Sequence, residues 1–197
     1  MPGDFVTVVS GLPRSGTSLV MQMLAAGGMP VVTDGQRVAD EHNPRGYFEL
    51  EAVKHTRTDH SWLASASGKA VKVIHLLLPH LPLDREYRVI FMQRDLAEVI
   101  ASQRAMLQQQ GRPAANLPDA KLAELFGNQL SQVRQWLSQN RNFRVLHLQH
   151  REVIGMPLTA AQQIATFLGS GLDPARMAAA VQPGLYRQRG ANPKPPL

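Results

Sequence analysis

Val6-Thr7-Val8-Val9-Ser10-Gly11-Leu12-Pro13-Arg14-Ser15-Gly16-Thr17-Ser18 is the stretch that decides the fold of this chain. Its β-branched start is typical of a buried parallel strand, and the apolar residues after it recur at helical spacing through Leu24. A strand, a glycine loop and a helix together present backbone N–H groups and a helix N-terminus to a phosphate-like anion. Gly11 and Gly16 permit the positive φ angles and close backbone approach that such a loop needs.

The loop differs from the nucleotide P-loop in the position of its cation. The spacing of Gly11 and Gly16 matches G-x-x-x-x-G-K-[ST], but Thr17 stands where the lysine would be, and Arg14 supplies the charge inside the loop. This displacement disfavours an ordinary ATPase or GTPase and indicates another anionic group. Two other functions stay open for a loop of this kind: a P-loop nucleotide kinase or NTPase, and a noncatalytic nucleotide-binding module.

The length of 197 residues suits a single domain, which we place at 1–190, followed by a flexible tail at 191–197. The net charge of +6 is scattered rather than gathered in a basic stripe with aromatics, so we expect no nucleic-acid partner. The chain has no cysteine, no apolar run near the roughly 20 residues of a membrane span, and a strand almost at its first residue. We therefore expect a cytoplasmic protein without a membrane span, whose oligomeric state the sequence leaves open.

Strands alternate with helical segments along the chain. This alternation predicts a three-layer, P-loop-like α/β fold with a mostly parallel sheet of about five strands and helices on both faces. Ligands in such folds bind beyond the carboxyl ends of the strands. The predicted strands are 6–10, 29–33, 70–75, 87–93 and 143–148, and the predicted helices are one ending at Ala26, one at 50–65, one beginning at Asp95, one at 119–139, and two more divided near 169–174.

The loop Pro13-Arg14-Ser15-Gly16-Thr17-Ser18 resembles the 5′-phosphosulfate loop of sulfotransferases, which reads Pro-Lys/Arg-Ser-Gly-Thr-Thr/Ser. Those enzymes share the P-loop fold and use 3′-phosphoadenosine 5′-phosphosulfate as sulfuryl donor. The resemblance implies that Gly11 and these six residues bind the donor, with Arg14 stabilising charge on the bridging oxygen. It also implies transfer, without a metal, to a hydroxyl or amine of a small-molecule or carbohydrate acceptor.

A second anion site follows the predicted strand at 87–93. Arg94 lies directly after this strand, at the ligand-binding edge, and its planar guanidinium suits bidentate phosphate binding. Ser102, on the next helix, can donate a hydrogen bond to the same group. The spacing of these two residues resembles the 3′-phosphate motif of sulfotransferases, which assigns them to the 3′-phosphate of the donor. The same resemblance adds three residues from a late basic segment: Arg187, Arg189 and Gly190.

The acceptor chemistry needs a base for the acceptor proton and a cation for the charge of the leaving oxygen. Lys72 and His75 resemble the Lys-Thr-His of cytosolic sulfotransferases with one extra residue between them, and strand alternation turns them apart unless the strand ends between them. Glu49 lies where carbohydrate-sulfating members carry a glutamate, and burial beside aromatic residues would raise its pKa and suit it as the base. His75 and Glu49 are near-equal candidates, with Lys72 adding charge to the transition state. The acceptor pocket would be built from 34–67 and 108–119.

Overall fold

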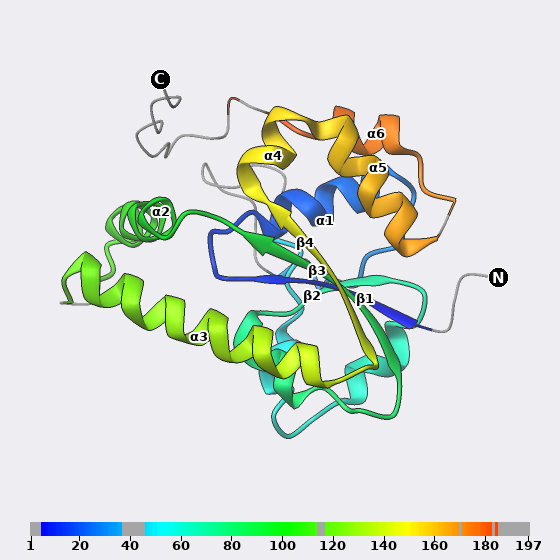
Figure 1. Ribbon diagram of the computed structural model, residues 1–197, viewed down its shortest axis with the longest axis horizontal. Helices are drawn as coiled ribbons and strands as arrows, with labels where there is room; N and C mark the ends of the chain where they lie inside the picture. Colours follow the sequence, from blue (N-terminus) through cyan, green and yellow to red (C-terminus); the bar gives the residue numbers. More distant parts are fainter. Residues whose placement is uncertain (1–4, 37–45, 114–116, 170, 183, 185–197) are drawn as a thin grey trace.

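The computed structural model describes residues 5–36, 46–113, 117–169, 171–182 and 184, and it confirms the predicted α/β fold (Figure 1). Within these residues the sheet contains four parallel strands in the order β2-β1-β3-β4. The strands are Phe5–Gly11 (β1), Ala70–Lys72 (β2), Glu86–Gln93 (β3) and Phe143–Gln149 (β4). The α-helices are Thr17–Ala26 (α1), Leu96–Gln109 (α2), Asp119–Gln139 (α3), His150–Gly155 (α4), Pro157–Leu168 (α5) and Pro174–Ala179 (α6). The 3-10 helices are Glu51–His55 (η1), Ser61–Ser65 (η2) and His75–His80 (η3).

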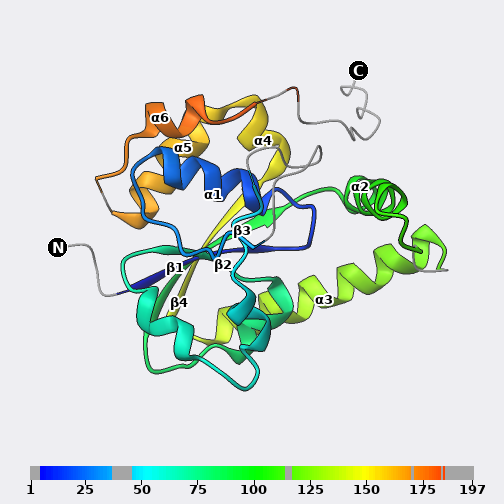
Figure 2. The same ribbon diagram turned by 180° about the vertical axis from the view of Figure 1, so that it is seen from behind.

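The sheet separates two hydrophobic cores, because successive side chains of a strand point to opposite faces. In β3, Tyr87, Val89 and Phe91 point to the face covered by α3 and the 3-10 helices. Ile90 and Met92 point to the other face, which α1, α5 and α6 cover (Figures 1 and 2). Covering both faces buries the near-continuous apolar runs of the central strands, as a parallel sheet requires.

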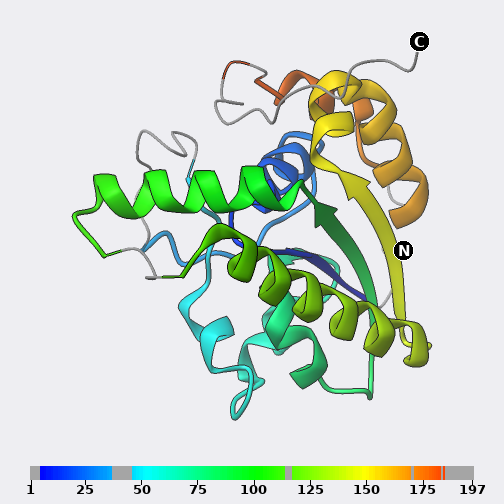
Figure 3. The same ribbon diagram turned by 60° about the vertical axis from the view of Figure 1, so that its left-hand side comes forward.

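The strand order places a crevice at the carboxyl ends of β1 and β3. β1 lies between β2 and β3, so the connection after β1 goes to one side of this strand and the connection after β2 goes to its other side. Ligands of open α/β sheets bind at such a switch point. The last residue of β1, Gly11, is in register with Met92 of β3, so the loop after β1 and Arg94 after β3 begin side by side. From this edge α2 runs outward, and α3 returns beside it toward β4 (Figure 3).

The predicted fifth strand at 29–33 is wrong. This segment forms only one isolated bridge, between Val31 and Ala70, at the edge of the sheet beside β2. The carbonyl of Pro30 accepts from the Ala70 N–H, and the Val32 N–H donates to the Ala70 carbonyl. Because a proline has no backbone N–H, Pro30 interrupts the ladder that a longer strand would need.

The predicted helix at 50–65 is also wrong, since the segment forms η1 and η2 instead. The hydroxyls of Thr56 and Thr58 donate to backbone carbonyls three residues earlier, and the Asp59 carboxylate accepts from the Ser61 N–H. Such local bonds compete with the hydrogen bonds of an α-helix.

Toward the C-terminus, three helices follow β4 in the described residues where the sequence predicts two. The additional helix is α4, which ends at Gly155; Pro157 then starts α5, a position that tolerates proline. No helix in the described part of the chain is both long enough and apolar enough to cross a membrane. The predicted tail at 191–197 lies outside the described residues.

Candidate active site

The loop between β1 and α1 has the backbone of an anion site. Gly11, Arg14 and Gly16 have positive φ angles of 147°, 72° and 101°. A Cβ atom on Gly11 would lie 2.6 Å from the Met92 carbonyl oxygen, and one on Gly16 would lie 2.5 Å from the His150 ring. Both glycines are therefore required by close packing as well as by conformation. The N-cap residue of α1 is Gly16, which has no side chain to accept from the N–H groups of the first turn, so these groups can bind an anion.

The second predicted anion site adjoins this loop. The Arg94 guanidinium donates from Nη1 to the Arg14 carbonyl oxygen over 3.1 Å. Arg14 in turn donates from Nε to the Ser102 hydroxyl, also over 3.1 Å. The structure thus brings the loop, Arg94 and Ser102 together. We call the two predicted anion sites the anion cradles: one is the loop at 11–18, and the other is Arg94 with Ser102. The Arg14 side chain lies between them.

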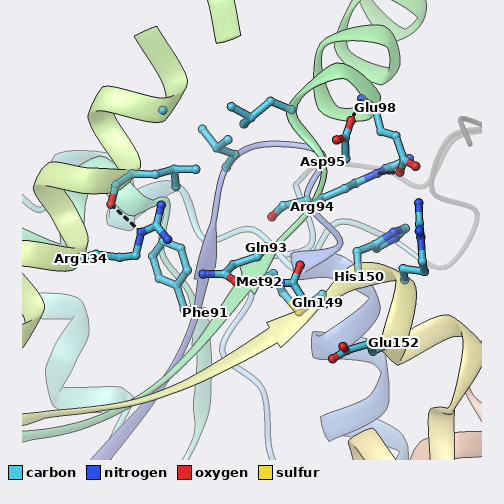
Figure 4. A pocket seen from close by; sticks show the side chains of 16 residues that line it. Phe91, Met92, Gln93, Arg94, Asp95, Glu98, Arg134, Gln149, His150 and Glu152 are labelled. Atoms are coloured by element: carbon cyan, nitrogen blue, oxygen red, sulfur yellow. Dashed lines mark hydrogen bonds and ion pairs between the residues drawn. The ribbon is translucent and has the colours of Figure 1, made fainter. Parts of the chain in front are cut away.

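Glu98 is a residue of this site that the sequence reasoning missed. Its carboxylate accepts from Arg94 Nε over 2.9 Å, and the side chains of Glu98 and Arg94 are only 3% and 9% exposed. Figure 4 shows the two side chains together at the start of α2, near His150. A buried carboxylate in this position orients the guanidinium and balances its charge. The signal was present, since Glu98 lies in the first turn of the predicted helix, four residues after Arg94.

Lys72 and Glu49 meet beside the N-terminus of α1. The Lys72 ammonium lies 3.3 Å from Glu49 Oε1, 3.3 Å from the Ser18 hydroxyl and 3.1 Å from the Tyr47 carbonyl oxygen. Between Tyr47 and Glu49 in the sequence, Phe48 has a φ of 52°, a left-handed conformation that is rare for a bulky residue. This kink lets the residues on both sides of Phe48 face the same lysine, and strain of this kind is concentrated at functional sites.

His75 takes a different direction. The strand does end between Lys72 and His75, as alternation would require for a shared site, but His75 begins η3 and is buried at 2% exposure. Its Nε2 lies 3.1 Å from Gln129 Oε1 of α3. Burial lowers the pKa of His75, and hydrogen bonding with Gln129 and with the backbone of Gly11 opposes that effect only in part. The structure therefore brings Glu49 to Lys72 and places His75 against α3.

A cavity of about 450 Å³ joins these groups. Its floor is the loop with Arg94, and Glu49 and Lys72 line one side. Residues of α1, α4 and the segment after α6 also contribute: Leu19, Gln22, His150, Ile154 and Gln182. Apart from Tyr47 and Lys54, the remaining wall is apolar and comes from η1, η3, the segment before η3, and α2. A second cavity, of about 510 Å³, opens at the tips of β3 and β4, and Arg94 and His150 line both cavities (Figure 4).

The comparison with protein families decides between the alternatives left by the loop. A family model described as a sulfotransferase domain matches residues 5–183. The chain belongs to this sulfotransferase family. It is therefore a sulfotransferase rather than a P-loop kinase or a noncatalytic module.

Solved structures show the same fold for this sulfotransferase. The sulfotransferase domain from the Synechococcus PCC 7002 olefin synthase is 16% identical, with a TM-score of 0.56, covering 100% of this chain and 93% of that one. The sulfotransferase domain from the curacin biosynthetic pathway is 14% identical, with a TM-score of 0.55 and coverages of 98% and 94%. Mouse sulfotransferase SULT7A1, complexed with PAP, is 17% identical, with a TM-score of 0.53 and coverages of 90% and 62%. No curated protein is significantly similar in sequence.

His150 is a second feature of the sulfotransferase site that the sequence reasoning passed over. Burial, with a smaller contribution from the nearby Arg94 charge, lowers the pKa of His150 to about 4, while Glu98 opposes the shift. The ring is therefore neutral at pH 7, and it packs directly against Gly16 of the loop. Its position was a usable signal, because His150 follows the predicted strand at 143–148 at the same edge of the sheet as Arg94.

The remaining predicted donor ligands, Arg187, Arg189 and Gly190, lie outside the described residues. In the described part of the sulfotransferase, no group of three or more His, Asp or Glu side chains is arranged to hold a metal ion.

Proposed function

We propose that this sulfotransferase takes its sulfuryl group from 3′-phosphoadenosine 5′-phosphosulfate and transfers it to a hydroxyl or amine of a small-molecule or carbohydrate acceptor. The observation that carries the proposal is the contact of the two anion cradles through Arg14, since a donor with phosphates at both ends of its ribose needs adjoining cradles. The PAP complex of mouse sulfotransferase SULT7A1 supports the same donor, because adenosine 3′,5′-bisphosphate is the product that this donor leaves.

The loop residues 11 and 13–18 and the N-terminus of α1 hold the 5′-phosphosulfate in this proposal. Arg94, oriented by Glu98, and Ser102 hold the 3′-phosphate. The adenine lies against the α1 and α4 side of the cavity, where two apolar side chains offer a flat contact and two amides and an imidazole offer hydrogen bonds: Leu19, Ile154, Gln22, Gln182 and His150. Arg187, Arg189 and Gly190 are proposed as further ligands of the 3′-phosphate.

The reaction we propose is an in-line displacement at sulfur. The acceptor oxygen or nitrogen forms a bond to sulfur while the bond between sulfur and the bridging phosphate oxygen breaks. The electron pair of that bond stays on the bridging oxygen, and adenosine 3′,5′-bisphosphate leaves. The carboxylate of Glu49 takes the acceptor proton. Lys72 stabilises the charge on the sulfuryl oxygens, and Arg14 stabilises the charge on the bridging oxygen by electrostatics alone, since a guanidinium does not give up its proton.

Glu49 is our choice of base over His75 for a geometric reason. Glu49 lines the cavity and lies 3.3 Å from Lys72, which also reaches Ser18 of the donor loop. A base must reach the acceptor proton within hydrogen-bonding distance. His75 is held against Gln129 of α3 and is not among the residues that line this cavity.

Calorimetry tests the donor assignment. We expect adenosine 3′,5′-bisphosphate to bind at least about tenfold more tightly than adenosine 5′-phosphate, because hydrogen bonds to charged groups contribute roughly 1.5–3 kcal/mol each. Equal affinities would refute the 3′-phosphate site. Release of the bisphosphate from the labelled donor in the presence of a broad acceptor panel then tests the transfer itself. The cytoplasmic location and the absence of a metal requirement stay predictions.

A further inference from the structure

The wall of the cavity beside Glu49 is apolar, and we call it the acceptor wall. It is built from three segments that are distant in the sequence: the start of η1, the stretch from β2 into η3, and the last turn of α2. Its members are Leu50, Val53, Val73, Ile74, Leu77 and Met106. Val53, Val73 and Leu77 belong to the buried core of the α3 face, so this wall is a rigid extension of the core into the cavity.

The charges around the acceptor wall are paired with one another. Lys72 pairs with Glu49 over 3.3 Å, and Lys54 pairs with Glu51 over 2.6 Å. The Lys54–Glu51 pair is exposed, with side-chain exposures of 61% and 50%, and only its lysine lines the cavity. The six side chains of the acceptor wall itself carry no charge and offer few hydrogen bonds to a polyol.

We propose that the acceptor is an uncharged alcohol with an apolar body, aliphatic or aromatic, rather than a carbohydrate; this inference rests on the proposed transfer reaction. The hydroxyl points at Glu49 and the apolar body lies along the acceptor wall. Burying a sugar there would strip water from several hydroxyls that find no partners on this wall, which is costly. Burying methylene or aryl carbons there is favourable in proportion to the area covered.

The chain-length dependence of alcohol binding tests this proposal. We expect the affinity of 1-alkanols for the enzyme bound to adenosine 3′,5′-bisphosphate to rise about fourfold per methylene from ethanol to 1-hexanol. Glucose, which has the same number of carbons as 1-hexanol, should bind at least about a hundredfold more weakly than 1-hexanol. A flat chain-length series, or glucose that binds as well as 1-hexanol, would overturn the proposal.

Ile74 and Leu76 provide a matched pair of variants. Both are exposed apolar residues, at 42% and 39%, but only Ile74 lines the cavity. Ile74→Asn should weaken 1-hexanol roughly fivefold and leave ethanol unchanged, whereas Leu76→Asn should change neither. Equal effects of the two variants would count against the acceptor wall as the binding surface.

The two proposals fail in different ways. If adenosine 3′,5′-bisphosphate does not bind, the donor assignment is wrong, and the alkanol series on the free enzyme still tests the wall. If the bisphosphate binds and labelled sulfate goes to glucose but not to 1-hexanol, transfer stands and the acceptor class proposed here is wrong. Sulfate transfer to 1-hexanol, reduced in Ile74→Asn and retained in Leu76→Asn, would support both.

Discussion

Replacing Glu49 by glutamine tests the assignment of the base. The change keeps the size of the side chain but removes its ability to accept a proton as a carboxylate. General bases contribute roughly 10²- to 10⁴-fold to turnover, so we expect kcat to fall by at least about a hundredfold, which corresponds to about 2.7 kcal/mol of barrier.

The effect on folding should be much smaller than the effect on turnover. The Glu49 side chain is 27% exposed, and its ion pair with Lys72 spans 3.3 Å. Partly exposed pairs contribute about 1 kcal/mol or less, so the free energy of unfolding should change by no more than that amount. Adenosine 3′,5′-bisphosphate should bind Glu49→Gln within about threefold of the parent, because neither cradle is altered.

The assay is single-turnover transfer from labelled donor, with chemical denaturation and calorimetry on the same protein samples. His75→Gln is the matched control, since it alters the other candidate base. That variant should lose stability through its buried contact with Gln129, by roughly 1–3 kcal/mol, while keeping turnover within about tenfold of the parent. A folded Glu49→Gln that keeps near-normal turnover, with a folded His75→Gln that loses it, would refute the geometric reasoning.

Three other perturbations have clear expected outcomes. Arg94→Met should weaken adenosine 3′,5′-bisphosphate at least about tenfold and adenosine 5′-phosphate little, measured by calorimetry; equal losses for the two nucleotides would contradict the 3′-phosphate role. Arg14→Ala should abolish most of the turnover while much of the donor affinity remains, and a kinetic assay that finds persistent activity would remove Arg14 from the bridging oxygen. Lowering the pH from 6.5 to 4 should reduce the free energy of unfolding by up to about 3 kcal/mol through His150. The reason is that the unfolded chain protonates this histidine at its ordinary pKa, whereas the native state is protonated only near pH 4. Urea titrations of the parent and of His150→Gln check this, and the variant should have the shallower pH dependence.

The positions of the loop and of Arg94 in the fold could be predicted because each depends on neighbours in the sequence. The loop from Gly11 to Ser18 joins a strand to a helix within a few residues, and Arg94 follows a strand whose apolar run is unmistakable. The strand and loop therefore bring each chemical group to the same edge in any parallel sheet that contains them. The prediction fails where one local residue overrides a pattern, as Pro30 does at the expected fifth strand.

The contacts of the two candidate bases could not be predicted, because they depend on residues far away in the chain. Glu49 reaches Lys72 because Phe48 adopts a left-handed conformation. An aromatic residue in the sequence gives no indication of such a φ angle. His75 turns away because η3 starts there and α3 provides Gln129 as its partner. Side chains that are equally suitable by chemistry are thus separated by packing.

By itself, the sequence determined the class of fold, the lysine-free glycine loop and the arginine at the end of β3, since periodicity and adjacency along the chain set all three. Tertiary structure alone decided that Glu98 pairs with that arginine, that Glu49 pairs with Lys72 while His75 contacts Gln129 of α3, and that apolar residues from η1, β2–η3 and α2 form one wall. The physical reason is that a side chain's direction and neighbours depend on where each element ends and what packs against it, and those depend on residues far away in the chain.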